Sequence, residues 1–181
     1  MNPFSNKSLL YISVLFLLVG LSACKSKKKI QQSSDEIVVE TIIIEKDIIY
    51  NDVEREIIDE ALTWLGTPYS YGASEKGIST DCSGMVMVIY RDIADIKMPR
   101  NSAKQAEFCK KIKEKDVRGA DLVFFATGSD ENQISHVGIM LDDVKFIHAS
   151  ASKGVIISEM TTPYYKRHFK MYGRVRQNSD K

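Results

Sequence analysis

Residues 81–90 read DCSGMVMVIY, and they form the central segment of the predicted fold. The run from Met85 to Tyr90 is apolar throughout, which indicates a buried helix. A turn-rich loop over residues 67–77 precedes it, so the helix is expected to begin close to Cys82. One thiol would therefore lie at the N-terminus of a buried helix.

Two further helices are predicted on either side of this segment. Residues 51–66 begin with a capping-box pair, repeat apolar residues on one face and end in glycine. Ser102 and Gln105 form another capping-box pair, which opens a helix through Cys109 toward Ile112.

The pattern changes after residue 120 to short runs rich in β-branched and aromatic residues, separated by Gly, Asp and Ser turns. These runs cover residues 122–125, 136–141, 146–149, 155–158 and 172–175. Helices followed by strands, without βαβ alternation, predict an α+β fold in which N-terminal helices pack on one antiparallel β-sheet.

The N-terminal end has the features of an export signal. Lys7 precedes an apolar run over residues 9–19, which is too short to span a membrane stably. Leu21-Ser22-Ala23-Cys24 then resembles the lipobox of bacterial lipoproteins, in which the cysteine is lipidated and becomes the mature N-terminus. The alternative is a chance cysteine beside an ordinary signal peptide.

These features predict a lipoprotein signal peptide over 1–23, a lipidated N-terminus and tether over 24–50, and one catalytic domain over 51–177. The residue after Cys24 is Lys25, whereas an aspartate there would suggest inner-membrane retention by resemblance to enterobacterial lipoproteins. We therefore expect a chain anchored in the membrane through its N-terminal lipid, in the outer membrane and facing the periplasm. Two β-branched runs within the tether, 37–39 and 42–44, look strand-like.

The overall charge does not favour a nucleic-acid partner. The 181 residues include 25 lysines and arginines against 24 aspartates and glutamates, so no net field would attract a polyanion. We expect one domain with appendages, a monomer, no nucleic acid and no cofactor.

Cys82 is a candidate nucleophile because of its predicted place at a helix N-terminus. A thiol there, next to an imidazolium, can have its pKa lowered by several units and become a thiolate. His136, at the start of a strand, is the candidate general base, and His148, on the following strand, would orient it. The first free amides of the helix would face a developing oxyanion.

Each of these residues also has an ordinary interpretation. A histidine in a strand is more often structural, and a cysteine on an apolar helix is usually a small buried hydrophobic residue. Zinc binding by two histidines and a cysteine is a further alternative, but the spacing matches no metal-site motif, and we expect no metal site.

Several motifs together resemble the NlpC/P60 cysteine peptidases in order and spacing. They are Tyr69-Ser70-Tyr71-Gly72, Asp81-Cys82-Ser83-Gly84, Asp121-Leu122-Val123-Phe124-Phe125, His136-Val137-Gly138-Ile139 and His148-Ala149-Ser150. The resemblance extends over about residues 56–176, the whole globular part, and is greatest to lipid-anchored murein endopeptidases.

This resemblance implies a papain-like NlpC/P60 fold and a peptidoglycan hydrolase that cleaves amide bonds in murein stem peptides. Cys82 matches the nucleophile, His136 the base and His148 the third catalytic residue of a Cys-His-His triad. Tyr69 matches a tyrosine near the oxyanion site, and Ser83 a position that shapes the substrate site.

The bond that is cut is left open by the sequence. Overall likeness favours the crosslink between D-alanine and diaminopimelate, and the alternative is the bond between γ-D-glutamate and diaminopimelate. An amidase or acyltransferase using the same thiol chemistry is also compatible with the sequence. A noncatalytic wall-binding lipoprotein is a third class, which the intact Cys82, His136 and His148 disfavour.

The other cysteines fit this assignment. A disulfide between Cys82 and Cys109 would block the proposed nucleophile, so we expect none. Cys109 is expected to be a buried, inert thiol in the third helix.

Overall fold

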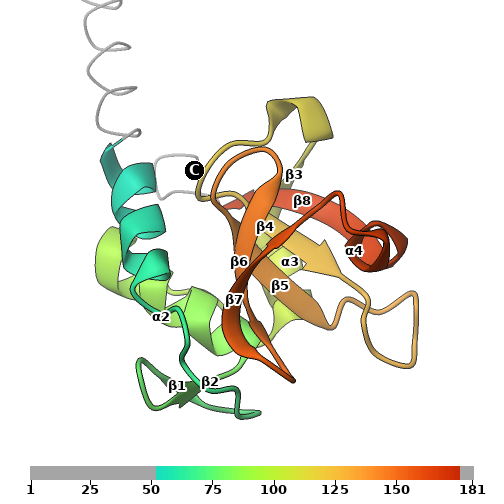
Figure 1. Cartoon of the computed structure of the whole chain (residues 1–181). Helices are drawn as coiled ribbons and strands as arrows, with labels where there is room; N and C mark the ends of the chain where they lie inside the picture. Colours follow the sequence, from blue (N-terminus) through green and yellow to red (C-terminus); the bar gives the residue numbers. More distant parts are fainter. Residues whose placement is uncertain (1–51, 176–181) are drawn as a thin grey trace, which may run out of the picture. The chain divides into compact units, whose positions relative to one another are not determined.

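Six antiparallel strands form one sheet in the order β3-β8-β4-β5-β6-β7 (Figure 1). The computed structural model describes residues 52–175. Its strands are β3 (Cys109–Ile112), β4 (Leu122–Phe125), β5 (His136–Met140), β6 (Lys145–Ser150), β7 (Gly154–Glu159) and β8 (Phe169–Val175).

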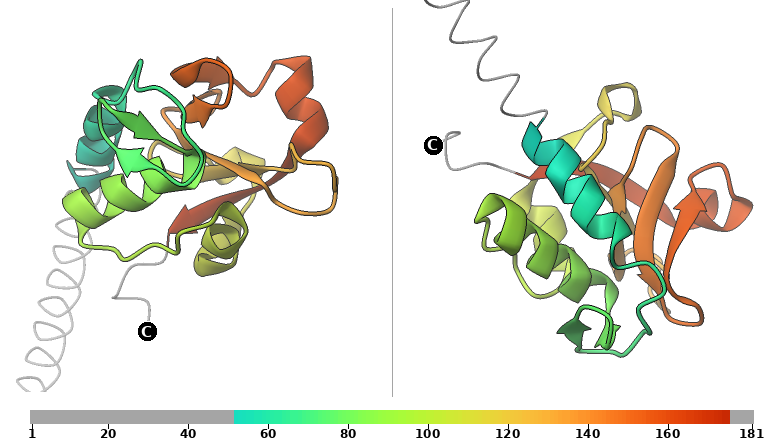
Figure 2. Two further views of the ribbon diagram at one scale, coloured as in Figure 1. Left: turned by 90° about the horizontal axis from the view of Figure 1, so that it is seen from below. Right: turned by 60° about the vertical axis from the view of Figure 1, so that its left-hand side comes forward.

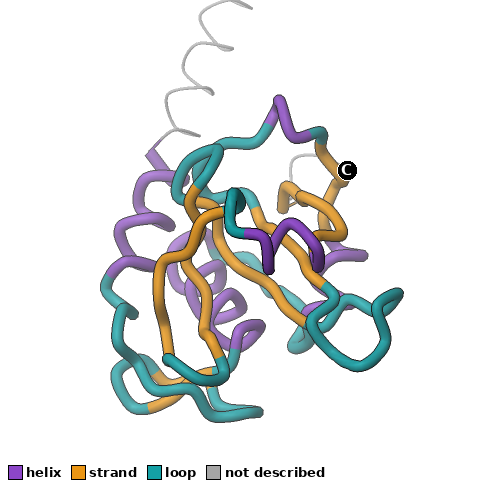
Figure 3. Tube along the Cα trace, turned by 45° about the vertical axis from the view of Figure 1, so that its right-hand side comes forward, coloured by secondary structure: helices purple, strands orange, loops and turns teal. Residues whose placement is uncertain are grey.

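Helices lie on both faces of this sheet. The helix over residues 52–62 and α2 (Cys82–Ala94) cover one face, whereas α4 (Pro163–His168) lies against the other (Figures 2 and 3). A small hairpin of β1 (Ser74–Glu75) and β2 (Ser79–Thr80) precedes α2. Two short helices, α3 (Ser102–Phe108) and the 3-10 helix η1 (Glu114–Asp116), flank β3 in the chain.

Alternating side chains of the strands build a separate core on each face of the sheet. On the face covered by α2, Val137 and Ile139 of β5 pack in one cluster with Met85, Val86 and Ile89 of that helix. On the α4 side, Phe125 and Phe146 belong to a second cluster, against which Tyr165 of α4 packs. Full burial of each such side chain contributes about 1.5–3 kcal/mol.

The predicted α+β class and antiparallel sheet are confirmed, and so is the buried helix that begins at Cys82. The predicted strands correspond to β4, β5, β6, β7 and β8 within a few residues.

The helix predicted from Ser102 toward Ile112 is wrong in its second half. It ends at Phe108, and Cys109 begins β3, which pairs with β8 so that Cys109 lies opposite Val175. The cap also differs, because the side chain of Asn101 accepts a hydrogen bond from the Lys104 amide at 2.9 Å. Long-range pairing with β8 here outweighs the local helix signal.

The predicted signal peptide, Cys24 and the tether with its strand-like runs lie outside the described residues. Within residues 52–175, no helix has both the length and the apolar character needed to cross a membrane.

Candidate active site

The nucleophile candidate is positioned by a strongly defined start of α2. Asp81 is the N-cap residue, with an extended backbone, and its carboxylate accepts a hydrogen bond from the Gly84 amide at 2.7 Å. Gly84 is required by contact with the preceding loop, because a Cβ there would lie 2.4 Å from the Ala73 carbonyl oxygen. The sequence Asp-Cys-Ser-Gly thus fixes where the helix begins and how closely the hairpin packs on it.

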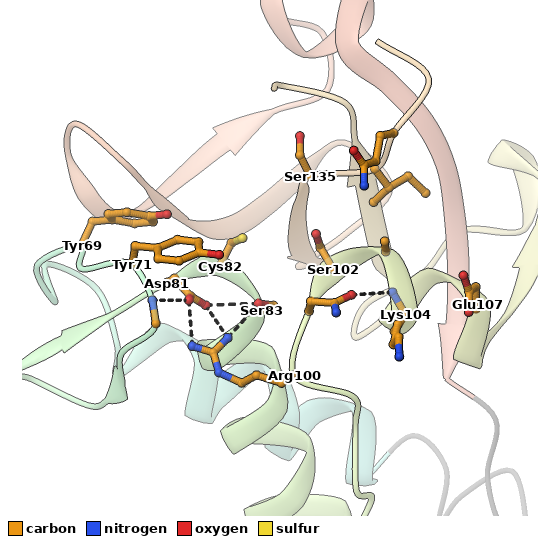
Figure 4. Close-up of a pocket in the computed structure, with 15 residues that line it drawn as sticks. Tyr69, Tyr71, Asp81, Cys82, Ser83, Arg100, Ser102, Lys104, Glu107 and Ser135 are labelled. Atoms are coloured by element: carbon orange, nitrogen blue, oxygen red, sulfur yellow. Dashed lines mark hydrogen bonds and ion pairs between the residues drawn. The ribbon is translucent and has the colours of Figure 1, made fainter. Parts of the chain in front are cut away.

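Asp81 also connects this helix start to the segment before α3. Arg100 donates to both carboxylate oxygens of Asp81, at 2.9 and 2.7 Å, and to the Ser83 hydroxyl at 3.0 Å (Figure 4). The Gly72 amide donates to the same carboxylate at 2.8 Å. Burial alone would raise the pKa of Asp81, but the hydrogen bonds from Arg100, Gly84 and Gly72 hold it below its usual value.

Cys82 is a free thiol that is 7% exposed, so no disulfide joins it to Cys109. Burial raises the pKa of the Cys82 thiol to about 11, against the opposing effect of a hydrogen bond from the Val137 amide. The lowered pKa expected at a helix N-terminus is therefore wrong for the resting site, because desolvation outweighs the helix terminus. The sulfur is protonated at neutral pH.

The two candidate histidines are in direct contact. Nε2 of His136, at the start of β5, lies 2.8 Å from Nδ1 of His148, on β6. Their rings are perpendicular, with centroids 4.9 Å apart. Burial lowers the pKa of His136 to about 4, and burial together with the nearby His136 lowers that of His148 to about 3, so both imidazoles are neutral at pH 7.

The structure thus brings the two histidines together and places the thiol beside the same strand. The Val137 amide, which bonds the sulfur of Cys82, belongs to the residue directly after His136. Among the hydrogen bonds of residues 52–175, none joins this sulfur to an imidazole nitrogen, as is common for catalytic groups in the absence of substrate. Burial favours the neutral forms of both groups over the expected thiolate and imidazolium.

Two surface grooves are lined by these residues. The cysteine groove, of about 640 Å³, is lined by Cys82 and by Tyr69, Tyr71, Arg100, Ser102 and Ser135 among others (Figure 4). The histidine groove, of about 780 Å³, is lined by His136 and His148 with Ser158 and Tyr165 among others. Cys82 lines the first groove and the two histidines line the second, and Ser135 of the first directly precedes His136 of the second.

Tyr69 and Ser83, the other two predicted site residues, lie next to Cys82 but differ in exposure. Tyr69 is half-buried in the cysteine groove, and its pKa is raised by burial and by the proximity of Cys82. Ser83 is buried, and its hydroxyl donates to Asp81 at 3.2 Å and accepts from Arg100. The Ser83 side chain therefore supports the helix start.

Sequence reasoning missed the polar groups around His148. Its Nε2 lies 3.0 Å from both the Ser158 hydroxyl of β7 and the Tyr165 hydroxyl of α4. These contacts depend on the register of β6 with β7, in which His148 lies opposite Ile156 and Phe146 opposite Ser158. No local motif encodes that register.

The described part of the chain contains no group of three or more His, Cys, Asp or Glu side chains that could hold a metal ion. The candidate site is thus a thiol beside a pair of hydrogen-bonded imidazoles.

Comparison with known proteins identifies relatives over this whole region. The model of the NlpC/P60 family matches residues 66–174. The chain is 35% identical over 176 residues to a protein of Escherichia coli (strain K12) named murein DD-endopeptidase MepS/murein LD-carboxypeptidase, covering 93% of this chain and 91% of that one. It is 43% identical over 112 residues to the probable endopeptidase NlpC of the same strain, covering 61% and 71% of the two chains.

Solved structures agree with this relationship. A Staphylococcus aureus structure described as similar to lipoprotein, NLP/P60 family, superposes with a TM-score of 0.63 and 31% identity. The match covers 70% of this chain and 42% of that one, so the shared part is less than half of the larger protein. The chain belongs to the NlpC/P60 family.

Proposed function

We propose that this chain is a cysteine endopeptidase that hydrolyses amide bonds in the stem peptides of bacterial peptidoglycan. Cys82 is the nucleophile, His136 the general base and His148 the residue that orients it. The observation that carries the proposal is the joint arrangement of the three groups. The thiol lies at the start of α2 against the Val137 amide, while the preceding residue, His136, is bonded to His148 at 2.8 Å.

The proposed reaction begins from neutral groups. Nε2 of His136 is occupied by His148, so Nδ1 is the nitrogen that takes the thiol proton as the sulfur attacks the amide carbonyl carbon. The resulting oxyanion is stabilised by the backbone amides of Cys82 and Ser83 at the helix start, which already interact with the sulfur in the resting site. The imidazolium then gives its proton to the leaving amine, and a thioester remains on Cys82.

Water completes the cycle. His136 removes a proton from the water that attacks the thioester carbonyl, the carbon–sulfur bond breaks, and the proton returns to the sulfur. Because the starting thiol has a raised pKa and the imidazole a lowered one, proton transfer is favourable only as the sulfur forms its bond to carbon.

The favoured bond is the crosslink between D-alanine and diaminopimelate. The overall likeness to a relative named murein DD-endopeptidase supports this choice. The alternative is cleavage between γ-D-glutamate and diaminopimelate within one stem. Purified dimeric and monomeric muropeptides distinguish the two, because the first cut separates dimers and the second shortens individual stems, as mass spectrometry would show.

The first prediction tests the nucleophile. Cys82→Ala is expected to lower turnover of muropeptides by at least about 1000-fold, because the covalent step needs the sulfur. Cys109→Ala is the matched control, since Cys109 is a buried thiol in β3. It should retain turnover. Circular dichroism would verify that both variants fold.

The outcomes separate an enzyme from a wall-binding protein. Unchanged turnover in Cys82→Ala would refute the triad, and absence of turnover in the wild-type protein on every muropeptide, with binding to sacculi retained, would favour the noncatalytic alternative.

We further propose that the protein is held at the membrane through a lipid on Cys24, with the outer membrane as its location. The support is the lipobox-like Leu21-Ser22-Ala23-Cys24 and the following Lys25. Several acyl chains at about 0.8 kcal/mol per buried methylene would anchor it durably.

A further inference from the structure

The outer nitrogen of His148 is bonded by two hydroxyl groups that come from different elements. Ser158 Oγ, on β7, and Tyr165 Oη, on α4, each lie 3.0 Å from His148 Nε2. The two hydroxyls are also joined to each other, with Ser158 donating to Tyr165 at 3.3 Å. Together with the contact between His148 and His136, this makes a continuous chain of hydrogen bonds leading to the base.

Packing holds this chain in place. His148 is 2% exposed. The Tyr165 ring lies edge-on to Phe146 at 4.9 Å and to His148 at 5.5 Å, and 5.3 Å from Phe125. A hydroxyl on a ring held by three aromatic neighbours has little freedom to leave its partner.

A neutral imidazole carries its proton on only one of its two nitrogens. The nitrogen that carries the proton in His148 therefore determines which atom donates and which accepts in each hydrogen bond leading to His136. When His148 carries its proton on Nε2, its Nδ1 is an acceptor. Nε2 of His136 must then be the donor, and Nδ1 of His136 keeps a free lone pair. When His148 carries its proton on Nδ1 instead, the tautomer of His136 is reversed and its Nδ1 already holds a proton.

We propose that Ser158 and Tyr165 are positioning residues that accept a hydrogen bond from Nε2 of His148 and thereby keep Nδ1 of His136 free to act as the base. This inference rests on the proposed function, because it assigns Nδ1 of His136 as the acceptor of the thiol proton. Both hydroxyls also line the histidine groove, where their own protons can be donated to solvent or, for Ser158, to Tyr165.

The same arrangement favours the step in which His136 becomes charged. The Nδ1 lone pair of His148 accepts a hydrogen bond from the imidazolium Nε2–H, and the Nε2–H of His148 remains directed at two oxygen atoms. The hydroxyls therefore act on the reaction through His148, without touching the substrate.

The direct test is the histidine tautomer, measured by long-range ¹H–¹⁵N NMR on the uniformly labelled full-length protein. His168 is an internal reference, because its Nδ1 lies 2.8 Å from the Ala126 carbonyl oxygen, which can only accept. His168 must therefore carry a proton on Nδ1. We expect the opposite signature, a proton on Nε2, for His148 in the wild-type protein.

The variants to compare are the double substitution Ser158→Ala with Tyr165→Phe and the matched control Tyr172→Phe. The double variant is expected to lose the fixed Nε2–H signature of His148 and to lower kcat by about 10- to 100-fold with little change in KM. Tyr172 is buried on the same face of the sheet, and no hydrogen bond of its hydroxyl is found within residues 52–175. Its variant should keep both the tautomer and kcat.

Two results would overturn the inference: a proton on Nδ1 of His148 in the wild-type protein, or an unchanged tautomer and kcat in the folded double variant. If the double variant fails to fold, the wild-type spectrum still tests the inference, because it shows which nitrogen of His148 carries the proton. The same spectrum can be recorded on Cys82→Ala, so failure of the tautomer assignment is distinguishable from failure of the nucleophile assignment, which only turnover reports.

Discussion

Asp81 is the residue on which the geometry around the thiol depends most directly. Its carboxylate caps α2 through Gly84, receives the Gly72 amide of the preceding loop and pairs with Arg100. These partners come from three different segments, so the ionised carboxylate links the loop, the helix and the approach to α3.

The charge on Asp81 is expected to stabilise the fold in a pH-dependent manner. Asp81→Asn keeps a good helix cap but loses the ion pair, at a cost of about 1 kcal/mol at pH 7, reduced by the partial exposure of Arg100. The folded pKa of Asp81 is lowered, so this stability is present above the unfolded pKa and is lost as pH falls through the folded value.

Urea unfolding between pH 7 and pH 3 would measure this effect. The difference between wild type and Asp81→Asn should shrink as the solution becomes acidic. Asp92→Asn, which removes the exposed pair with Arg91, is the control and should change stability little at any pH. A difference that stayed constant down to pH 3 would contradict an ionised, stabilising Asp81.

At this scale, sequence reasoning found residues with strong local signals and missed those defined by packing. Cys82 follows a capping aspartate and precedes an apolar helix, and the histidines begin or occupy β-rich runs. Ser158 and Tyr165 stand in ordinary surroundings in the sequence and reach His148 only after β7 and α4 have packed beside β6. The raised thiol pKa was missed for the same reason, because burial is a property of the folded chain.

Among the secondary-structure elements, α2 and the β1–β2 hairpin approach each other closely at Gly84. A Cβ on Gly84 would lie 2.4 Å from the Ala73 carbonyl and 3.0 Å from the Ser74 Cβ. The Ala73 carbonyl belongs to the backbone and Gly84 belongs to a helix, so neither can move away without shifting its whole segment.

Gly84→Ala is therefore expected to destabilise the protein by about 2 kcal/mol or more, through overpacking, and to reduce turnover by displacing Cys82. Gly128→Ala is the control, because a Cβ there meets only ordinary contacts with Ser135 at 3.5 Å. Thermal unfolding and muropeptide assays would compare the two. Equal stability of both variants would show that the hairpin can shift at little cost.

The predicted elements succeed where one local pattern dominates. Periodicity predicts the apolar helix and the β-rich strands correctly, whereas residues 109–112, predicted as the end of a helix, form β3. Its pairing partner, β8, lies more than 50 residues further along the chain. The residues next to β3 in the sequence therefore give no information about this pairing. The cap at Asn101 was missed by one position because Ser102 is equally good in isolation.

In the whole molecule, the described residues 52–175 lie within one compact unit. A chain that begins at Tyr50 is therefore expected to unfold in one cooperative transition and to cleave purified muropeptides like the full-length protein. Calorimetry and the turnover assay would test this. Loss of cooperative unfolding would show that the preceding residues complete the fold.

The proposed anchor has its own test. Cys24→Ser should move the protein from the membrane fraction to the soluble fraction of a bacterial host, because no acyl chain can be attached. Cys109→Ser, altered at a buried cysteine far along the chain, is the control and should stay with the membrane. A Cys24→Ser protein that still sedimented with membranes would refute lipidation as the anchor.

The buried, protonated sulfur of Cys82 has a consequence for durability. Peroxide and alkylating reagents react with thiolates, so a thiol with a pKa of about 11 is a poor target while the enzyme is idle. Under the proposed mechanism the sulfur becomes reactive only while a peptide is bound, so Cys82 of the unoccupied protein is expected to resist oxidation and alkylation.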